Sequence, residues 1–203
     1  MLNFVEELSL VEPVRMEKGF VRTYDLIESL RDDVHKSFEE LESNKKSQFR
    51  RRSTVRCIFS YMEGTLSALK YELLRELRRS DLFKGEAKVK ARGLLEEKIT
   101  EKKTSGESKR MLHIPLDQNI SRTFALAAKL WKLDFSLEES GTGYRSLLTA
   151  KKARNHLTHP KTYYDINITD TEMGGSSRNI SMVLGRVLPS METTCSLASH
   201  RVA

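Results

Sequence analysis

Two long segments carry apolar side chains at alternating steps of three and four residues, the spacing of one face of an amphipathic α-helix. The first covers residues 20–41 and the second covers residues 55–77. Their apolar positions are Phe20, Tyr24, Ile27, Leu30, Val34, Phe38 and Leu41, then Val55, Ile58, Phe59, Met62, Leu66, Leu69, Leu73, Leu74 and Leu77. Gly64 interrupts the second face, where it weakens the helix slightly and leaves room for close packing. The pattern predicts two long helices.

Two further main helices are expected after residue 115. Asp117 is a suitable N-cap for the third, whose apolar face is Ile120, Phe124, Ala127, Ala128 and Trp131, with Trp131 in the core. The run Ser140–Gly143 breaks the chain, and a fourth helix with Tyr144, Leu147, Leu148 and Leu157 ends before Pro160. No segment of residues 1–160 alternates with period two for long enough to form a sheet. The sequence therefore predicts an all-α fold, a bundle of four or five helices.

Two regions differ in character from this helical domain, which is predicted to span residues 1–165. Residues 80–112 form a charged, exposed insertion with three glycine breaks, and Leu94, Leu95 and Ile99 favour a short helix within it. Residues 166–203 form a C-terminal extension, partly extended or disordered. Alternation of Tyr164, Ile166 and Ile168 predicts a short strand or extended arm at its start, and Ser, Thr and Gly dominate the rest.

Composition excludes several classes of protein. The longest uninterrupted apolar run is Phe124–Ala128, whereas a membrane-spanning helix needs about 20 such residues. Glu6, Glu7 and Glu12 lie where a signal peptide requires a basic and then an apolar stretch. Two cysteines, Cys57 and Cys195, cannot build a disulfide framework. We therefore expect a soluble cytoplasmic protein without a membrane partner.

The net charge of +7 indicates an anionic partner, and part of the surplus is concentrated near one predicted turn. Residues 45–56 contain six basic side chains and no acidic one: Lys45, Lys46, Arg50, Arg51, Arg52 and Arg56. This cluster suits a phosphate backbone, and it equally suits a solvated turn between two helices. Phe49 is the only aromatic residue within it, so the cluster itself does not indicate base stacking.

The most informative segment is residues 151–160, at the predicted end of the last helix. It contains Lys151, Lys152, Arg154, Asn155, His156 and His159. An arginine can hold a phosphate by a bidentate fork, and a histidine can move a proton near neutral pH. Together they suit cleavage of RNA, whose 2′-hydroxyl is a built-in nucleophile and requires no metal. The alternative is structural, because Lys and His at a helix C-terminus complement the macrodipole and Asn often caps the helix.

Metal binding is the weaker interpretation of the same segment. His156 and His159 lie three residues apart and Asp165 follows. These residues do not match a recognised ligand spacing, so we expect neither a metal nor another cofactor.

The stretch from Arg154 to His159 resembles the Arg-x4–6-His motif of the HEPN superfamily (higher eukaryotes and prokaryotes nucleotide-binding). The residue after the motif arginine is commonly Asn in that family, as Asn155 is here. The segment Arg56–Glu63 resembles an earlier core helix of the family, which often carries a Glu among apolar residues. The resemblance covers roughly residues 15–165 and leaves out the 80–112 insertion and the C-terminal extension.

The resemblance implies a helical bundle that dimerises and a metal-independent endoribonuclease, as in toxin–antitoxin and phage-defence systems. By position, Arg154 would contact the scissile phosphate, His159 would transfer protons, and Asn155 would orient one of them or the substrate. His156 and Glu63 would be secondary, and a rim salt bridge is the simpler expectation for Glu63. RNA would contact Lys45, Lys46, Arg50, Arg51, Arg52, Lys151 and Lys152. A protein antitoxin or regulator would be a further partner.

The chemistry itself also favours a homodimer. Attack by a 2′-hydroxyl requires one group to take a proton and another to give one. Each chain offers one well-placed histidine, since His35, His113 and His200 lie in separate segments. A two-fold axis beside the motif would bring two copies of Arg154 and His159 into one cleft.

Two other functions compete with the nuclease. One is a non-catalytic helical module that binds RNA or a protein partner, and the other is a binding partner of a nucleotidyltransferase. Tyr163 and Tyr164 are expected to pack in the core or an interface, with base stacking as the alternative.

Overall fold

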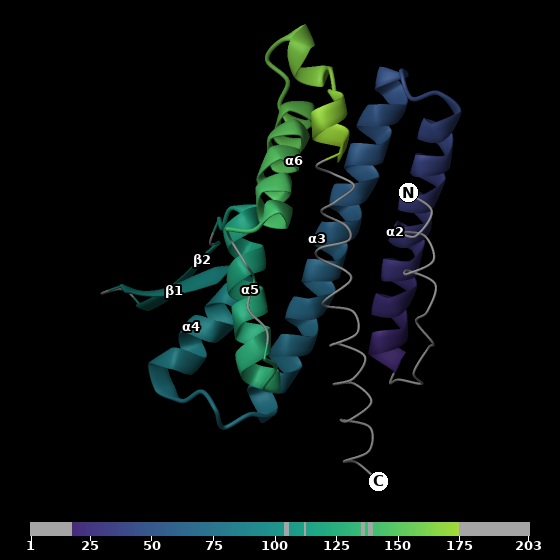
Figure 1. Ribbon diagram of the computed structural model, residues 1–203. Helices are drawn as coiled ribbons and strands as arrows, with labels where there is room; N and C mark the ends of the chain where they lie inside the picture. Colours follow the sequence, from purple (N-terminus) through teal and green to yellow (C-terminus); the bar gives the residue numbers. More distant parts are fainter. Residues whose placement is uncertain (1–17, 104–105, 112, 135–136, 138–139, 175–203) are drawn as a thin grey trace. The chain divides into compact units, whose positions relative to one another are not determined.

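A computed structural model describes residues 18–103, 106–111, 113–134, 137 and 140–174 of the chain (Figure 1). In chain order its elements are α2 (Lys18–Ser43), α3 (Gln48–Arg79), α4 (Gly85–Glu96), β1 (Lys98–Lys103), β2 (Gly106–Met111), α5 (Leu116–Trp131), α6 (Thr142–Thr158) and the 3-10 turn η1 (Tyr163–Ile166). Residues 170–174 are also helical. The described chain is mostly helical, which confirms the all-α class.

The chain divides into two compact units. The first unit comprises residues 1–65 and 140–203, and its described elements are α2, the first half of α3, α6 and η1. The second unit comprises residues 66–139, with the rest of α3, α4, the two strands and α5. The predicted divisions, a helical domain of residues 1–165 with an insertion at 80–112 and an extension of residues 166–203, do not coincide with these two units.

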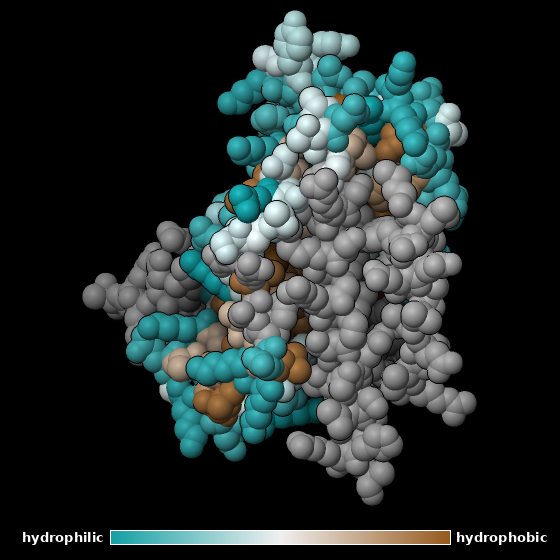
Figure 2. Space-filling view, in the orientation of Figure 1, coloured by the Kyte–Doolittle hydropathy of each residue, from teal (hydrophilic) through white to brown (hydrophobic). Residues whose placement is uncertain are grey.

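The core of the first unit is built from the faces that the periodicity indicated. Its buried apolar side chains are Val34 and Leu41 of α2, Val55, Ile58, Phe59, Tyr61 and Met62 of α3, Leu147, Ala150, Ala153 and Leu157 of α6, and then Ile168 and Met173. Helices α2 and α3 run side by side (Figure 1). A Cβ atom on Gly64 would lie 2.5 Å from Leu30 Cδ1, so the glycine permits the close approach expected of it. Hydrophilic residues cover most of the described surface on the face shown in Figure 2.

Helices α5 and α6 correspond to the expected third and fourth helices, and some details of their ends differ from the prediction. Helix α5 begins at Leu116 with Pro115 in the N-cap position, so the prediction of Asp117 as N-cap was wrong. Pro115, with φ −54° and ψ 140°, lies outside the helix, and Asp117 lies in its first turn instead. Trp131 is the last residue of α5 and is half-exposed, not a core residue. Helix α6 begins at Thr142, within the expected break of Ser140–Gly143, and Gly141 is its N-cap.

The second unit contains a β-hairpin that the sequence did not indicate. Strands β1 and β2 pair antiparallel, with Lys98 opposite Met111 and Lys103 opposite Gly106. The expected short helix exists as α4 and contains Leu94 and Leu95, but Ile99 belongs to β1. Glu97 adopts a left-handed conformation with φ 51° and ends the helix. A Cβ on Gly93 would lie 2.7 Å from the Lys98 carbonyl oxygen, so glycine lets the chain fold back there.

The start of the C-terminal extension also differs from expectation. Tyr164, Ile166 and Ile168 were predicted to form a short strand or an extended arm, whereas Tyr163–Ile166 form a 3-10 turn. A capping box closes this turn, with Thr162 as N-cap and Asp165 as its partner. This local hydrogen bonding outweighs the weak alternation of the side chains. Ile168 is buried, so the extension is part of the first unit's core at that point.

Several sequence expectations fall outside the described residues. They concern Glu6, Glu7, Glu12, Cys195, His200 and the Ser- and Thr-rich residues 175–203. Within the described helices, none is long and apolar enough to cross a membrane.

Candidate functional site

Arg154 of α6 and Glu63 of α3 form an ion pair, although 91 residues separate them in the sequence. Arg154 Nη2 donates to Glu63 Oε1 at 2.6 Å, and the two side chains are 35% and 42% exposed. Their backbones are fixed by buried neighbours, Ala153 on α6 and Met62 on α3. The pair therefore lies at the edge of the first unit's core and remains open to solvent. Glu63 forms the salt bridge expected of it, and its partner is the motif arginine.

Asn155 completes a small polar group around the guanidinium. Its Oδ1 accepts a hydrogen bond from Arg154 Nη1 at 3.3 Å, and its side chain is exposed. An arginine carries five N–H donors in a planar fork, and the contacts to Glu63 and Asn155 use two of them. Arg154 is thus oriented from two sides while its charge stays partly accessible.

His159 is the first residue after α6 and is exposed. Its backbone N–H donates to the Asn155 carbonyl oxygen at 3.0 Å and closes the last turn of the helix. Among the described residues, no hydrogen bond or ion pair of the His159 imidazole is found. The structure thus places Arg154, Asn155 and His159 within the last turn and a half of one helix, without joining the imidazole to the guanidinium.

His156 lies on the exposed side of α6 and faces the turn that follows the helix. Asp165 accepts hydrogen bonds from the backbone N–H groups of Lys161 and Thr162, both at 2.8 Å. These bonds lower the pKa of Asp165, and the Thr162 hydroxyl and the charge of His156 lower it further. The charge of His156 makes the smallest of these contributions, and a secondary place for His156 in the site stays a prediction.

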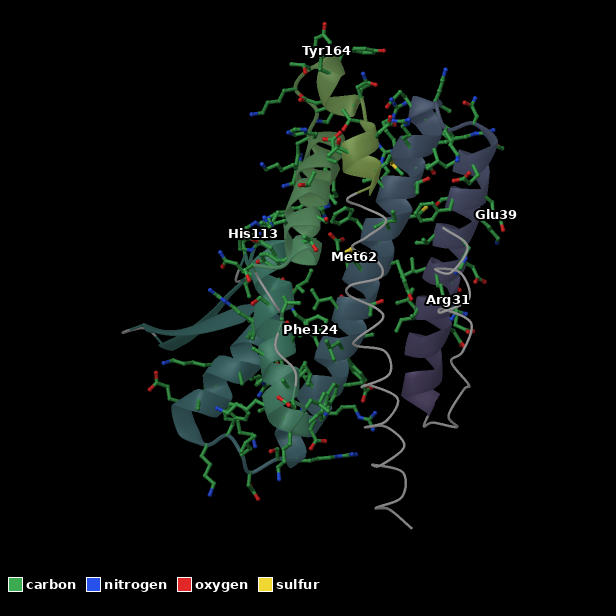
Figure 3. The ribbon with its side chains drawn as sticks, in the orientation of Figure 1. Arg31, Glu39, Met62, His113, Phe124 and Tyr164 are labelled. Atoms are coloured by element: carbon green, nitrogen blue, oxygen red, sulfur yellow. The ribbon has the colours of Figure 1, made fainter. Side chains whose placement is uncertain are left out.

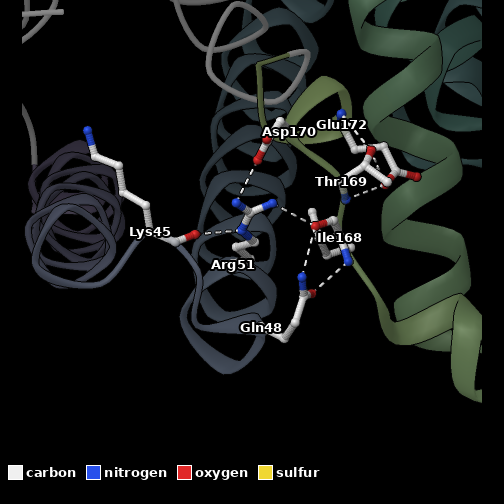
Figure 4. A network of polar contacts seen from close by, with 7 residues as sticks. All are labelled: Lys45, Gln48, Arg51, Ile168, Thr169, Asp170 and Glu172. Carbon is white, nitrogen blue, oxygen red and sulfur yellow. Dashed lines mark hydrogen bonds and ion pairs between the residues drawn. The ribbon is translucent and has the colours of Figure 1, made fainter.

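The basic cluster between α2 and α3 makes structural contacts that the sequence did not reveal (Figure 4). Arg51 donates from three nitrogens to three different elements: to the Lys45 carbonyl at 2.7 Å, to the Ile168 carbonyl at 2.9 Å and to the Asp170 carboxylate at 2.6 Å. Gln48 brackets the same Ile168 backbone, accepting from its N–H at 2.8 Å and donating to its carbonyl at 3.2 Å. We call Gln48, Arg51 and Ile168 the clamp.

The remaining cations of the cluster divide into two groups. Arg50 bonds the Glu40 carbonyl and the Ser43 hydroxyl, Arg52 bonds the Ile166 carbonyl at 3.1 Å, and Lys45 pairs with Glu42 at 2.7 Å. Lys46 and Arg56 of the cluster are exposed, as is Lys152 on α6, and Lys151 is half-exposed. Arg51 and Arg52 thus bond the C-terminal segment and Arg50 bonds the end of α2, and RNA contact by any member of the set stays a prediction.

The capping box of η1 and the bonds of Arg50 to the end of α2 could have been expected from the sequence, whereas the pairing of Gln48 with Ile168 could not. Thr162 and Asp165 have the Thr-x-x-acid spacing of a capping box. Lys and Arg near a turn commonly bond free carbonyls, which is the role that Arg50 has. Pairing of Gln48 with Ile168 has no local signal because 120 residues separate the two.

The described residues include no group of three or more His, Cys, Asp or Glu side chains placed to hold a metal ion. Comparison with protein-family models, curated proteins and solved structures found no match to this chain. The HEPN resemblance therefore rests on its motif residues.

Proposed function

We propose that the chain is a metal-independent endoribonuclease of the HEPN type. The observation that supports this most is the arrangement at the end of α6. There Arg154 is oriented by Glu63 at 2.6 Å and by Asn155 at 3.3 Å, and His159 is exposed at the next turn. A partly exposed guanidinium and, at the end of the same helix, an exposed imidazole are two of the groups that can act in cleavage of a phosphodiester.

In the proposed reaction the RNA 2′-hydroxyl attacks the adjacent phosphorus. The 2′-oxygen loses its proton to a base, the bond to the 5′-oxygen breaks, and that oxygen receives a proton from an acid. The products are a 2′,3′-cyclic phosphate and a 5′-hydroxyl. Arg154 stabilises the charge on the phosphate, and its contact with Glu63 fixes the fork in place. His159 carries a proton, and Asn155 keeps the guanidinium oriented.

A homodimer follows from the proton balance. One His159 supplies one proton-transfer group, whereas the reaction requires a base and an acid. Two chains related by a two-fold axis beside α6 would supply both, together with two copies of Arg154. Because uncontrolled cleavage of RNA harms a cell, we also propose that a protein partner, such as an antitoxin, restrains the enzyme.

Cleavage assays on matched variants test the proposal. The full chain is incubated with single-stranded RNA in EDTA, and the product ends are identified by mass spectrometry. We expect cyclic-phosphate ends and a loss of rate of roughly 100-fold or more in both Arg154→Ala and His159→Ala. Arg145→Ala and His113→Ala are controls, since Arg145 is an exposed arginine of the same helix and His113 is an exposed histidine of the second unit.

Two results would contradict the enzyme. One is equal cleavage by all five proteins, which would indicate a contaminating nuclease. The other is continued cleavage of an RNA whose 2′-hydroxyls are replaced by hydrogen, because the nucleophile would then be a different group.

The ion pair between Arg154 and Glu63 also favours a second candidate, a non-catalytic RNA-binding module. In this case Glu63 neutralises the motif arginine, and the cations around it hold RNA without chemistry. This module would bind RNA with strong dependence on salt and would release no cyclic phosphate.

A further inference from the structure

Tyr163 and Tyr164 form an exposed aromatic pair directly after the motif. Their side chains are exposed although both were expected to pack, with 76% and 80% of their surface accessible. The ring centroids lie 6.1 Å apart and the ring planes meet at 75°. In Figure 3, Tyr164 projects into solvent at the tip of the turn. Two large aromatic rings left in water at one point indicate a binding surface.

The pair is held on a rigid turn. The Asp165 carboxylate binds the N–H groups of Lys161 and Thr162, and the Asn167 N–H donates to the Tyr164 carbonyl at 3.1 Å. Beyond the turn, Arg52 holds the Ile166 carbonyl at 3.1 Å and Gln48 holds Ile168. The backbone that carries the two rings is therefore fixed before any ligand arrives, which lowers the entropic cost of binding.

The charges next to the pair favour an anionic ligand with planar groups. Lys161 precedes the turn, and His156 and His159 are exposed at the end of α6. The one nearby carboxylate within the turn, Asp165, is directed at backbone N–H groups. A protein interface would more commonly surround such rings with further apolar side chains. Single-stranded nucleic acid combines phosphates with unpaired bases that stack on aromatic rings.

We propose that Tyr163 and Tyr164 form a stacking corner for one unpaired RNA base. One ring supports the base face and the other, at 75°, meets its edge. The base belongs to a nucleotide next to the phosphate held by Arg154, and this placement rests on the proposed function. The inference names the substrate class as single-stranded or looped RNA, because bases in a duplex are not free to stack.

Binding measurements on four proteins test the corner. Each is titrated against a fluorescent 2′-O-methyl RNA of roughly 12 nucleotides, which resists attack by its own 2′-oxygen. An abasic strand with the same number of phosphates is the reference ligand. The proteins are the wild type, Tyr163→Ala/Tyr164→Ala, Tyr163→Phe/Tyr164→Phe and the control Tyr71→Ala, which removes an exposed tyrosine of the second unit. Analytical ultracentrifugation gives the oligomeric state of each.

We expect the wild type to prefer the strand with bases over the abasic strand by roughly 5- to 150-fold, the range for one stacked base. The double alanine variant loses this preference, while the double phenylalanine and Tyr71→Ala variants keep it. Absence of the preference in the wild type, or its survival in the double alanine variant, overturns the proposal. Conversion of a dimer to a monomer by the double alanine substitution also overturns it, since the rings would then belong to a protein interface.

Cleavage of unmodified RNA by the wild type, measured in parallel, separates this inference from the proposed function. Intact cleavage without base preference overturns the corner alone. Base preference without cleavage supports the corner and contradicts the endoribonuclease.

Discussion

Substitution of Arg51 tests whether the basic cluster has a structural role in addition to any role in RNA binding. It is only 13% exposed, and its three nitrogens reach the turn after α2, the backbone of Ile168 and the Asp170 carboxylate. Replacement of Arg51 by Lys keeps the positive charge but removes the planar fork. A single ammonium group cannot reach acceptors in three directions.

The expected loss of stability follows from these three contacts. The ion pair with Asp170 contributes little, because that carboxylate is 91% exposed and well screened. The two bonds to carbonyl oxygens are assisted by charge, and each contributes about 1.5 kcal/mol or more. Arg51→Lys retains one of them, so we expect a loss of about 2 kcal/mol, and about 3 kcal/mol for Arg51→Ala. For a chain of this length a loss of 2 kcal/mol corresponds to a fall in Tm of roughly 4–8 °C.

Thermal unfolding and amide hydrogen exchange measure the effect. Exchange of the Ile168 amide should accelerate, because the clamp loses its second side chain. Arg56→Lys is the matched control, an exposed arginine of the same helix, and it should stay within about 0.5 kcal/mol of the wild type. If Arg51→Lys melts like the wild type and its Ile168 amide exchanges no faster, the clamp contributes nothing and the reasoning fails.

Three further predictions concern packing and buried charge. Gly64→Ala should change the free energy of unfolding by less than about 1 kcal/mol, because the flexible end of Leu30 can move and alanine favours the helix. Gly64→Val should lower it by about 1–3 kcal/mol, as measured by chemical denaturation. Tyr61→Phe should leave Tm unchanged or raise it, since the Tyr61 hydroxyl is buried without a partner among the described residues. Burial raises the pKa of this hydroxyl to about 12, and the charge of Arg31 only partly offsets the rise. A clear fall in Tm would show that the hydroxyl has a partner. Lys70 is 7% exposed and pairs at 2.6 Å with Glu97, which is 40% exposed. Glu97→Ala should therefore lower the free energy of unfolding by about 2 kcal/mol, because it leaves the ammonium buried without its partner. Adding Lys70→Met to this variant should restore part of the lost stability. Burial alone would raise the pKa of Glu97, but hydrogen bonds from Lys70 and Asn119 and the charge of Lys70 lower it overall. The pair therefore stabilises the fold above about pH 4.3, and the advantage of the wild type over Glu97→Gln in urea titrations should shrink as the pH falls below that value.

The helices were predictable because each has a continuous apolar face. Val34 and Leu41 on α2 and Ile58 and Met62 on α3 are buried as the spacing of three and four required. Their burial depends on local periodicity, which a single sequence displays directly. The same argument places α6, whose Leu147 and Leu157 are buried.

The hairpin had no such signal. Apart from Ile99 and Met111, β1 and β2 consist of polar residues and a glycine, so neither shows the alternation by which a half-buried strand is recognised. The chain reverses just before the hairpin, at Glu97 and Gly93, where one residue is left-handed and the other needs to be glycine. Such a reversal is a property of backbone geometry, and the glycine alone predicted only a break.

The candidate site shows the same division between local and distant information. Arg154, Asn155 and His159 lie within six residues, so a short motif was enough to single them out. Glu63, Gln48 and Arg51 come from α3, and only the packed helices bring them to α6 and to the C-terminal segment. This difference bears on the proposed function, because without Glu63 the motif arginine would be oriented only by its longer bond to Asn155. The ion pair turns it into an oriented fork, and an oriented fork is what distinguishes stabilisation of a reacting phosphate from mere attraction to RNA.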